Sequence, residues 1–197
     1  ESLGEDPCLA GVLGVAMLRG FQGPDLGRPD AIAACAKHFA GYGAVEGGRD
    51  YAAANVPENE LRNVYLRPFK AAVEAGVASV MTSFSEVDGV PATASERLVR
   101  GILKDEWGFD GFVVSDWDSV RQLHTHGLTA SDRESALEAA RAGVDMEMHG
   151  DAYIAHLPAL VRGGEIDEAL VDAAVRRILG VKFRLGLFEN PYVDEGK

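Results

Sequence analysis

Short apolar runs alternate along the chain with longer amphipathic segments. The apolar runs that we predict to be strands cover residues 32–36, 77–84, 112–115 and 144–148. Between them, apolar residues recur every three or four positions, which is typical of one face of a helix. Strands that alternate with helices in this way form a parallel sheet covered by helices. The pattern therefore predicts an α/β fold.

Capping residues locate the beginnings of several predicted helices. Asp6 is a suitable N-cap and Pro7 suits the first helical position of a segment that follows it. Asp167 predicts the start of the last helix in the same way. Thr93 and Glu96 have the spacing of a capping box, in which each side chain bonds a free backbone N–H group.

About four strands are predicted in 197 residues. A complete eight-stranded (β/α)8 barrel typically needs about 250 residues. We therefore interpret residues 1–197 as one partial domain, the later half of a (β/α)8 TIM-type barrel. A doubly wound nucleotide-binding domain is the competing interpretation, but no glycine-rich phosphate loop follows any predicted strand.

Composition narrows the classes of ligand. The chain has 19 basic and 31 acidic residues, a net charge of −12. This balance argues against nucleic acid or an anionic membrane as a partner, because both attract basic surfaces. No run of about 18 apolar residues predicts a transmembrane helix. A small neutral molecule such as a sugar is compatible with the composition.

Cysteine and histidine give little support for a metal centre. Cys8 and Cys35 lack the spacing of a metal site, and we expect two buried, unpaired thiols. His124, His126 and His149 match no zinc pattern, so we expect solvated surface histidines. The sequence predicts neither a metal nor a cofactor.

The predicted strand ends point to candidate chemistry, because barrel enzymes carry their active sites at the carboxyl ends of the strands. Four places meet this condition: Lys37-His38, residues 81–85, Ser115-Asp116-Trp117 and residues 145–149. Asp116 would present a carboxylate at the barrel mouth beside the flat apolar face of Trp117, on which a sugar ring can pack. The alternative is that this segment only caps the next helix, and Asp118 is the expected cap.

Five short motifs occur in one order along the chain. They are LGEDP at 3–7, AKHF at 36–39, GRDY at 48–51, WGFDG at 107–111 and VSDW at 114–117. Together they resemble glycoside hydrolase family 3, in particular its bacterial β-glucosidase branch. The stretches 142–146 and 186–192 fit the same resemblance, which covers nearly the whole chain.

The resemblance implies a retaining β-glycosidase with a covalent glycosyl-enzyme intermediate. This chemistry uses two carboxyl groups about 5–5.5 Å apart, a nucleophile and an acid/base. The aspartate of the family's Ser-Asp-Trp motif is the nucleophile, which here is Asp116. The resemblance also implies a set of substrate-binding positions: Lys37, His38, Arg49, Met81, Phe84 and Trp117. Arg49 matches a motif without a definite role, and Phe84 stands where some members carry a tyrosine.

The acid/base is expected outside this chain, in a C-terminal α/β domain. The rest of the catalytic barrel is expected outside it as well, and the family resemblance favours a periplasmic or secreted protein. Four alternatives stay open: a β-xylosidase, a β-N-acetylglucosaminidase, a Schiff-base lyase that uses Lys37, and an inactive barrel fragment. The N-acetylglucosaminidase branch carries an Asp-His dyad in the loop after the Lys-His strand. Residues 39–43 read FAGYG, and no such dyad follows them.

Overall fold

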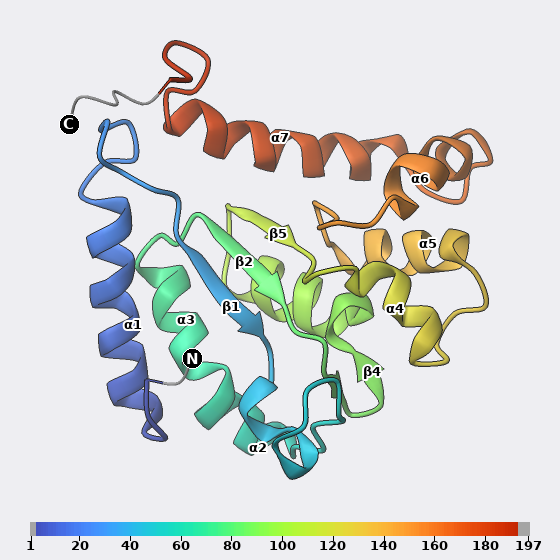
Figure 1. Cartoon of the computed structure of the whole chain (residues 1–197), viewed down its shortest axis with the longest axis horizontal. Coiled ribbons are helices and arrows are strands. Elements are labelled where there is room, and N and C mark those ends of the chain that lie inside the picture. Colours follow the sequence, from blue (N-terminus) through green and yellow to red (C-terminus); the bar gives the residue numbers. More distant parts are fainter. Residues whose placement is uncertain (1–2, 193–197) are drawn as a thin grey trace.

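A parallel sheet forms the centre of the computed structural model, which describes residues 3–192. The described sheet contains β1 (Cys35–Phe39), β2 (Ser79–Thr82) and β5 (Phe112–Val114) in the order β1-β2-β5. Figure 1 shows the three strands pointing the same way. Met146 adds a single parallel bridge to Val114 at the edge of β5. The predicted parallel sheet is confirmed.

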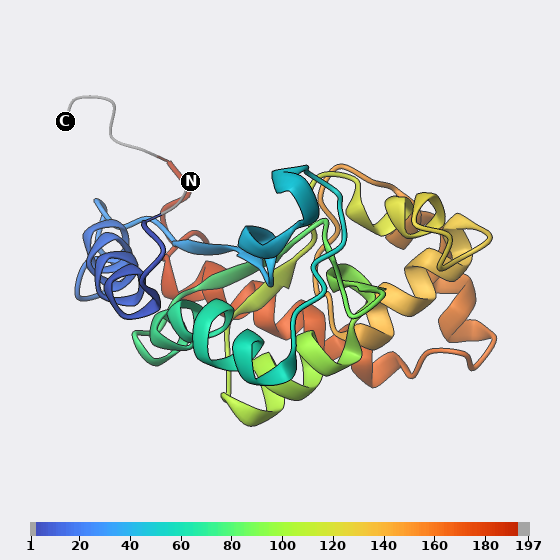
Figure 2. The same ribbon diagram turned by 90° about the horizontal axis from the view of Figure 1, so that it is seen from below.

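Helical segments join consecutive strands. Between β1 and β2 the chain forms α2 (Glu58–Glu60), a π-helical segment η3 (Leu61–Tyr65) and α3 (Arg67–Glu74). The π-helical segment η5 (Arg97–Glu106) joins β2 to β5. Figure 2 shows α3 and η5 on the same side of the sheet. They cover it through fully buried leucines, among them Leu66, Leu98 and Leu103.

The remaining elements surround this centre. They are α1 (Pro7–Gln22), η1 (Tyr42–Ala44), η2 (Glu46–Gly48), β3 (Glu86–Val87), β4 (Val90–Pro91), η4 (Ala92–Ala94), α4 (Ser119–Thr125), α5 (Asp132–Ala142), α6 (Ala152–Arg162) and α7 (Glu168–Arg184). Helix α7 crosses the amino ends of the strands, where Val181 packs with Ala78. Arg177 Nη1 also donates to the carbonyl oxygen of Phe109, at 2.8 Å. The opposite, carboxyl end of the sheet stays clear of this helix (Figure 1).

Two of the predicted caps are confirmed. Asp6 Oδ1 accepts hydrogen bonds from the backbone N–H groups of Cys8 and Leu9, both at 2.8 Å. Asp167 Oδ1 accepts from Ala169 N at 2.9 Å. Side-chain oxygens at these positions satisfy N–H groups that the first helical turn leaves free.

The predicted capping box of Thr93 and Glu96 is wrong. Ser95 Oγ accepts from Leu98 N, at 3.3 Å, and so serves the start of η5. The Thr93 hydroxyl is buried and bonds the hydroxyls of Thr82 and Ser119 instead. Buried hydroxyl groups are nearly always hydrogen-bonded, and the Thr93 hydroxyl is bonded to residues distant in the sequence rather than to the helix start.

Two predicted strands differ from the observed ones. The first begins at Cys35 rather than residue 32, so Lys37 and His38 lie within β1 and not after it. Residues 144–148 form only the bridge at Met146. Here side chains replace backbone partners: Val113 N donates to the Asp145 carboxylate, and Met148 N donates to the Ser115 hydroxyl. The regular ladder of backbone hydrogen bonds is therefore interrupted.

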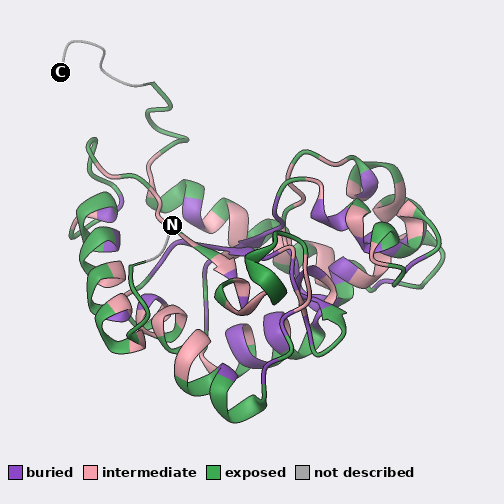
Figure 3. Cartoon of the chain, turned by 60° about the horizontal axis from the view of Figure 1, so that its bottom comes forward, coloured by how far each residue is buried: buried purple, intermediate pink, exposed green. Residues whose placement is uncertain are grey.

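Helix α1 exposes much apolar surface. Leu9, Val12 and Met17 are each more than half exposed. Figure 3 shows that buried residues lie only along the inner side of this helix. An apolar groove of about 1140 Å³ runs between α1, α3 and β1, and Met17, Phe21 and Phe69 are among its lining residues.

The predicted burial of the two thiols is wrong. Cys8 and Cys35 are both exposed and unpaired. Cys8 is exposed on α1, and Cys35 lies beside the groove at the start of β1. Within the described residues, β1 pairs on one side only, with β2, so its other side stays uncovered.

Candidate active site

The carboxylate of Asp116 lies directly beyond the carboxyl end of β5. Strand β5 ends at Val114, and Ser115 and Asp116 follow it. Asp116 is only 8% exposed. The backbone N–H of Trp117 donates to its Oδ1 atom at 2.7 Å, and His38 Nε2 lies 3.6 Å from Oδ2. The two contacts fix the carboxylate but leave Oδ2 without a close hydrogen bond from either group.

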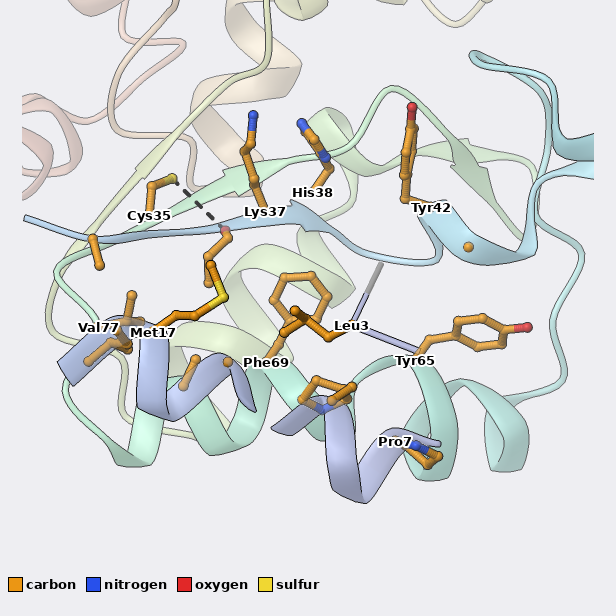
Figure 4. Close-up of a pocket in the computed structure, with 18 of the residues that line it drawn as sticks. Leu3, Pro7, Met17, Cys35, Lys37, His38, Tyr42, Tyr65, Phe69 and Val77 are labelled. Atoms are coloured by element: carbon orange, nitrogen blue, oxygen red, sulfur yellow. Dashed lines mark hydrogen bonds between the residues drawn. The ribbon is translucent and has the colours of Figure 1, made fainter. Parts of the chain in front are cut away.

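Strand β1 brings two further side chains to the same end of the sheet. The peptide bond between Lys37 and His38 is cis, and both side chains point to the same side of the strand (Figure 4). Tyr42 points in this direction as well, and its ring centroid lies 5.0 Å from that of His38. Lys37 is exposed, whereas His38 is partly buried. The site thus combines an ammonium group and an imidazole from β1 with a carboxylate from the loop after β5, two strands away in the sheet.

Residues 146–148 hold the loop that carries Asp116. Ser115 N donates to Met146 O at 2.9 Å, and Asp118 N donates to Met148 O at 3.0 Å. Met148 N donates to the Ser115 hydroxyl oxygen, also at 2.9 Å. The loop is therefore bonded to the neighbouring segment on both sides of Asp116, which orders its backbone.

Asp118 occupies the N-cap position of α4, as predicted, but its side chain makes no capping hydrogen bond. Its backbone has a φ angle of 55°, in the left-handed region that few non-glycine residues adopt. The backbone of the loop closes the helix start instead, through a bond from Ser119 N to Asp116 O at 3.1 Å. The expected capping role of the Asp118 side chain is wrong.

A row of buried hydroxyl groups connects the start of α4 to β2 and η4. Thr82 Oγ1 lies 2.9 Å from Thr93 Oγ1, which lies 3.0 Å from Ser119 Oγ. The row joins β2, η4 and α4. Because a buried hydroxyl without a partner costs about 1–3 kcal/mol, the row holds these elements in one relative position.

An aromatic pair stands next to Asp116. The rings of Trp117 and His149 are stacked, with centroids 3.7 Å apart and an angle of 18° between their planes. Trp117 is 56% exposed, so the indole stays available to a ligand. The sequence singled out Trp117, and His149 is exposed as predicted, but its stack on Trp117 was not predicted. No local signal marks the stack, because the two residues lie 32 positions apart.

The structure distributes the other predicted ligand-binding residues around the sheet edge. Met81 is buried in β2, where it pairs in register with Val114 of β5. Phe84 follows β2, and its ring packs on Tyr51 with centroids 4.5 Å apart. Arg49 is exposed at the end of η2. Asp116 thus contacts both His38 and the backbone of Trp117, while Arg49 lies on a surrounding loop.

A buried ion pair lies beneath the site. Lys104 Nζ is 2.7 Å from Asp145 Oδ1, and Asp145 Oδ2 accepts from Val113 N of β5 at 2.7 Å. Lys104 Nζ also donates to Gly143 O at 2.6 Å. Burial raises the pKa of the Asp145 carboxyl, while the Lys104 charge acts in the opposite direction. The pair ties η5 and the segment after α5 to the strand that leads to Asp116.

The histidines do not gather into a metal site. Within residues 3–192, no group of three or more histidine, cysteine, aspartate or glutamate side chains could hold a metal ion. His126 is not solvated as predicted, because its side chain is only 11% exposed and pairs with Glu86 at 2.8 Å. Among the same residues, no helix has both the length and the apolar character to cross a membrane.

Comparisons with known proteins place this geometry in a family. Residues 1–181 match the glycosyl hydrolase family 3 N terminal domain. A periplasmic beta-glucosidase of Salmonella typhimurium is 40% identical over the whole chain, and a putative beta-xylosidase of Formosa agariphila is 39% identical over 98% of it. The chain spans 26% of the length of each.

Solved structures agree with these relatives. A beta-glucosidase from Listeria innocua, solved in complex with isofagomine, superposes with a TM-score of 0.96 at 44% identity. The match covers 99% of this chain and 28% of that protein. Another structure of the Listeria innocua enzyme contains glucose, with a TM-score of 0.94. The sheet described above corresponds to part of a (β/α)8 barrel, as the sequence predicted.

Proposed function

This chain belongs to glycosyl hydrolase family 3, and we propose that it forms part of the catalytic barrel of a retaining, exo-acting β-glycosidase with Asp116 as the nucleophile. The observation that carries the proposal is the position of the Asp116 carboxylate. It is fixed at the carboxyl end of a barrel strand, beside an imidazole and an exposed indole. Active sites of barrel enzymes lie at this end.

The geometry suits nucleophilic attack on an anomeric carbon. The Trp117 N–H group orients Oδ1, which leaves Oδ2 to form the bond to the anomeric carbon. The bond from that carbon to the leaving oxygen breaks in the same step, and an acid elsewhere protonates the oxygen. Water then hydrolyses the glycosyl ester and restores the carboxylate. Lys37 and His38 would bind the hydroxyl groups of the sugar, because ammonium and imidazole groups are suitable donors.

The acid/base and the rest of the barrel belong to this proposal too. We place both outside the 197 residues, the acid/base in a C-terminal α/β domain. Helix α1 supports this arrangement, because it carries apolar residues on almost every side, as buried helices do. Further strands and helices of the barrel would cover the groove beside β1 and the exposed surface of α1.

The substrate would be a small carbohydrate with a terminal β-linked sugar. A β-glucoside is the first candidate, because solved beta-glucosidases superpose on this chain with TM-scores of 0.94 and 0.96. A β-xyloside is the second, because a relative of similar identity is named as a putative beta-xylosidase. We propose a periplasmic or secreted location, which the periplasmic relative supports.

Schiff-base chemistry at Lys37 has less support. A lysine nucleophile is usually activated by desolvation in an apolar pocket or by a nearby cation. Lys37 is exposed. The structure offers Asp116 in a buried, fixed position and Lys37 in a solvated one, so a covalent intermediate on the carboxylate is favoured.

Covalent labelling tests the nucleophile in the complete enzyme. We expect a 2-fluoro β-glucoside with a good leaving group to inactivate the enzyme and to leave a fluorosugar ester on Asp116, found by mass spectrometry of the digested protein. Asp116→Asn should lower kcat by at least about 10⁴-fold, because the variant lacks the covalent nucleophile. Asp118→Asn, the same change two residues away, should retain most of the activity.

A label on another residue, together with full activity of Asp116→Asn, would refute the assignment. Faster inactivation by the 2-fluoro β-xyloside than by the glucoside would identify the protein as a β-xylosidase. Trapping of a carbonyl substrate on Lys37 by borohydride would support the lyase instead.

A further inference from the structure

The stacked ring of His149 lies against a residue that the proposed site uses. Trp117 is 56% exposed and directly follows Asp116. A side chain so exposed can adopt several rotamers in the absence of neighbours. The His149 ring, at 3.7 Å and nearly parallel, is the aromatic partner of the indole in the described structure.

The backbone of His149 is held in a conformation that it would rarely choose. Its φ angle is 69°, in the left-handed region. Few non-glycine residues adopt this region, although histidine, asparagine and aspartate do so more often than most, so contacts around the turn hold the conformation in place. Such strain is often found at functional sites.

Two neighbours of His149 impose that conformation. The Glu147 carboxylate accepts hydrogen bonds from Ala152 N at 3.2 Å and Tyr153 N at 2.7 Å, which joins this turn to the start of α6. Gly150 packs so closely on Glu147 that an added Cβ atom would overlap its carboxylate. The turn therefore has little freedom to move the imidazole away from Trp117.

The other end of the turn is bonded to the loop of the nucleophile. Met148 exchanges two hydrogen bonds with that loop, one from its N–H to the Ser115 hydroxyl and one from Asp118 N to its carbonyl oxygen. His149 directly follows Met148. The imidazole is thus fixed relative to the same backbone that carries Asp116 and Trp117.

We propose that His149 is a positioning residue that holds the indole of Trp117 as a flat wall for the leaving group of the substrate. This inference rests on the proposed function and adds a residue to it. A sugar ring that leaves from the anomeric carbon presents an apolar face of C–H groups, which packs on an aromatic surface. An indole fixed in one rotamer binds such a ring without paying for its own immobilisation.

Loss of the stack should affect only substrates that contact the indole of Trp117. In this proposal, the second sugar of a disaccharide lies on the leaving side and contacts the exposed indole of Trp117. A β-glucosyl fluoride leaves as a single atom and does not. Loss of the stack should therefore weaken reaction with the disaccharide and leave reaction with the fluoride unchanged.

Three variants of the complete enzyme test the role. His149→Asn removes the ring but keeps a residue that tolerates the left-handed conformation. His149→Phe restores a flat ring at the same position. His156→Asn makes the same change on α6, away from the stack, and serves as the control.

Steady-state kinetics should separate the two substrates. We expect His149→Asn to lower kcat/KM for a β-linked glucose disaccharide by about fivefold, since aromatic pairs contribute about 0.5–1.5 kcal/mol. kcat/KM for β-glucosyl fluoride should stay within about twofold in the same variant. His149→Phe should restore the disaccharide value, and the control should match the unaltered enzyme.

A spectroscopic measurement tests the contact without substrate. In protein labelled with 5-fluorotryptophan, the ¹⁹F resonance of Trp117 is the one lost in Trp117→Phe. We expect that resonance to shift in His149→Asn, to move back in His149→Phe, and to stay in place in His156→Asn.

Equal losses for both substrates would overturn the inference, because His149 would then affect the whole site. Unchanged kinetics for both substrates, or an unmoved ¹⁹F resonance, would overturn it too. If the unaltered enzyme hydrolyses neither substrate, the proposed function itself fails, while the ¹⁹F measurement still reports whether the rings are stacked.

Discussion

Asp116 and Asp145 are the same residue type in two different surroundings. Asp116 contacts a backbone N–H group and an imidazole at the carboxyl end of the sheet. Asp145 is enclosed, and both of its oxygens have strong partners, Lys104 and Val113 N. A carboxylate with both oxygens in short hydrogen bonds is suited to fix structure, whereas Asp116 Oδ2 has, among the described residues, only the longer, 3.6 Å contact with His38 and suits the proposed attack.

The buried pair gives a prediction at this scale. Removal of one partner leaves the other charge buried without compensation, which typically costs about 3–5 kcal/mol. We expect Lys104→Met to lower the free energy of unfolding of the complete protein by that amount, measured by urea denaturation. The double variant Lys104→Met/Asp145→Leu should recover part of the loss, because neither charge remains.

A single variant within about 1 kcal/mol of the unaltered protein would contradict this expectation. Lys70→Met is the matched control, because Lys70 is exposed and lies 3.7 Å from Glu74 at the surface. Exposed pairs of this kind contribute about 0–1 kcal/mol.

The sequence indicated which residues lie at the site better than how they are held. Asp116 was placed at a strand end by the apolar run before it, and Trp117 came with it. The partner of Trp117 could not be predicted, since His149 reaches it through the bonds of Met148 to a distant loop. The functional roles of all the predicted site residues stay predictions: Asp116, Lys37, His38, Arg49, Met81, Phe84 and Trp117.

At the scale of elements, local signals succeeded where local contacts decide the structure. Asp6 and Asp167 cap helices through N–H groups two or three residues away, so their spacing was sufficient. Thr93 had the same kind of spacing but lies where Thr82 and Ser119 meet. Residues 144–148 had the apolar pattern of a strand, yet only Met146 bridges to β5.

A surface cluster joins α2 to η5 and gives a prediction about pH. Hydrogen bonds from Arg62 and Arg97 lower the pKa of Glu58 below its usual value of 4.5. The folded protein therefore binds the Glu58 proton less tightly than the unfolded chain. The stabilisation is fully present above about pH 4.5 and is lost as the pH falls through the lowered pKa.

We expect Glu58→Gln to lower the free energy of unfolding at pH 7 by about 1 kcal/mol or less, since solvent screens a side chain that is 49% exposed. The difference from the unaltered protein should shrink below pH 4 and in 1 M salt, where charges are screened. Glu74→Gln on α3 is the control. A difference that persists at low pH would show that the cluster acts through packing.

At the scale of the molecule, parallel strands and outer helices form an open part of a barrel. The order of strands was predictable because each apolar run is followed by a helix long enough to return the chain. Helix α1 was located correctly, but its surroundings were not predictable. Its apolar residues fill several sides, and the described chain buries only one of them.

This open surface predicts that some residues exposed in the described chain are buried in the complete protein. Met17 is 52% exposed here and lines the groove. If the rest of the barrel fills the groove, as proposed above, Met17→Ala should lower the free energy of unfolding of the complete protein by about 2–5 kcal/mol, as in a core. Arg19→Ala, at an exposed charged position of the same helix, should cost little. Equal, small effects of both changes would show that the groove stays open to water.

The loop of the nucleophile is fastened to residues 146–148 mainly by main-chain groups, and of the side chains only the hydroxyl of Ser115 takes part. The Met146 side chain is 42% exposed and contributes nothing to those bonds. Substitutions of the side chains at 146 and 148 would leave these main-chain bonds, and with them the Asp116 carboxylate, in place. In the proposed glycosidase, residues around the site could therefore vary while the proposed nucleophile keeps its position.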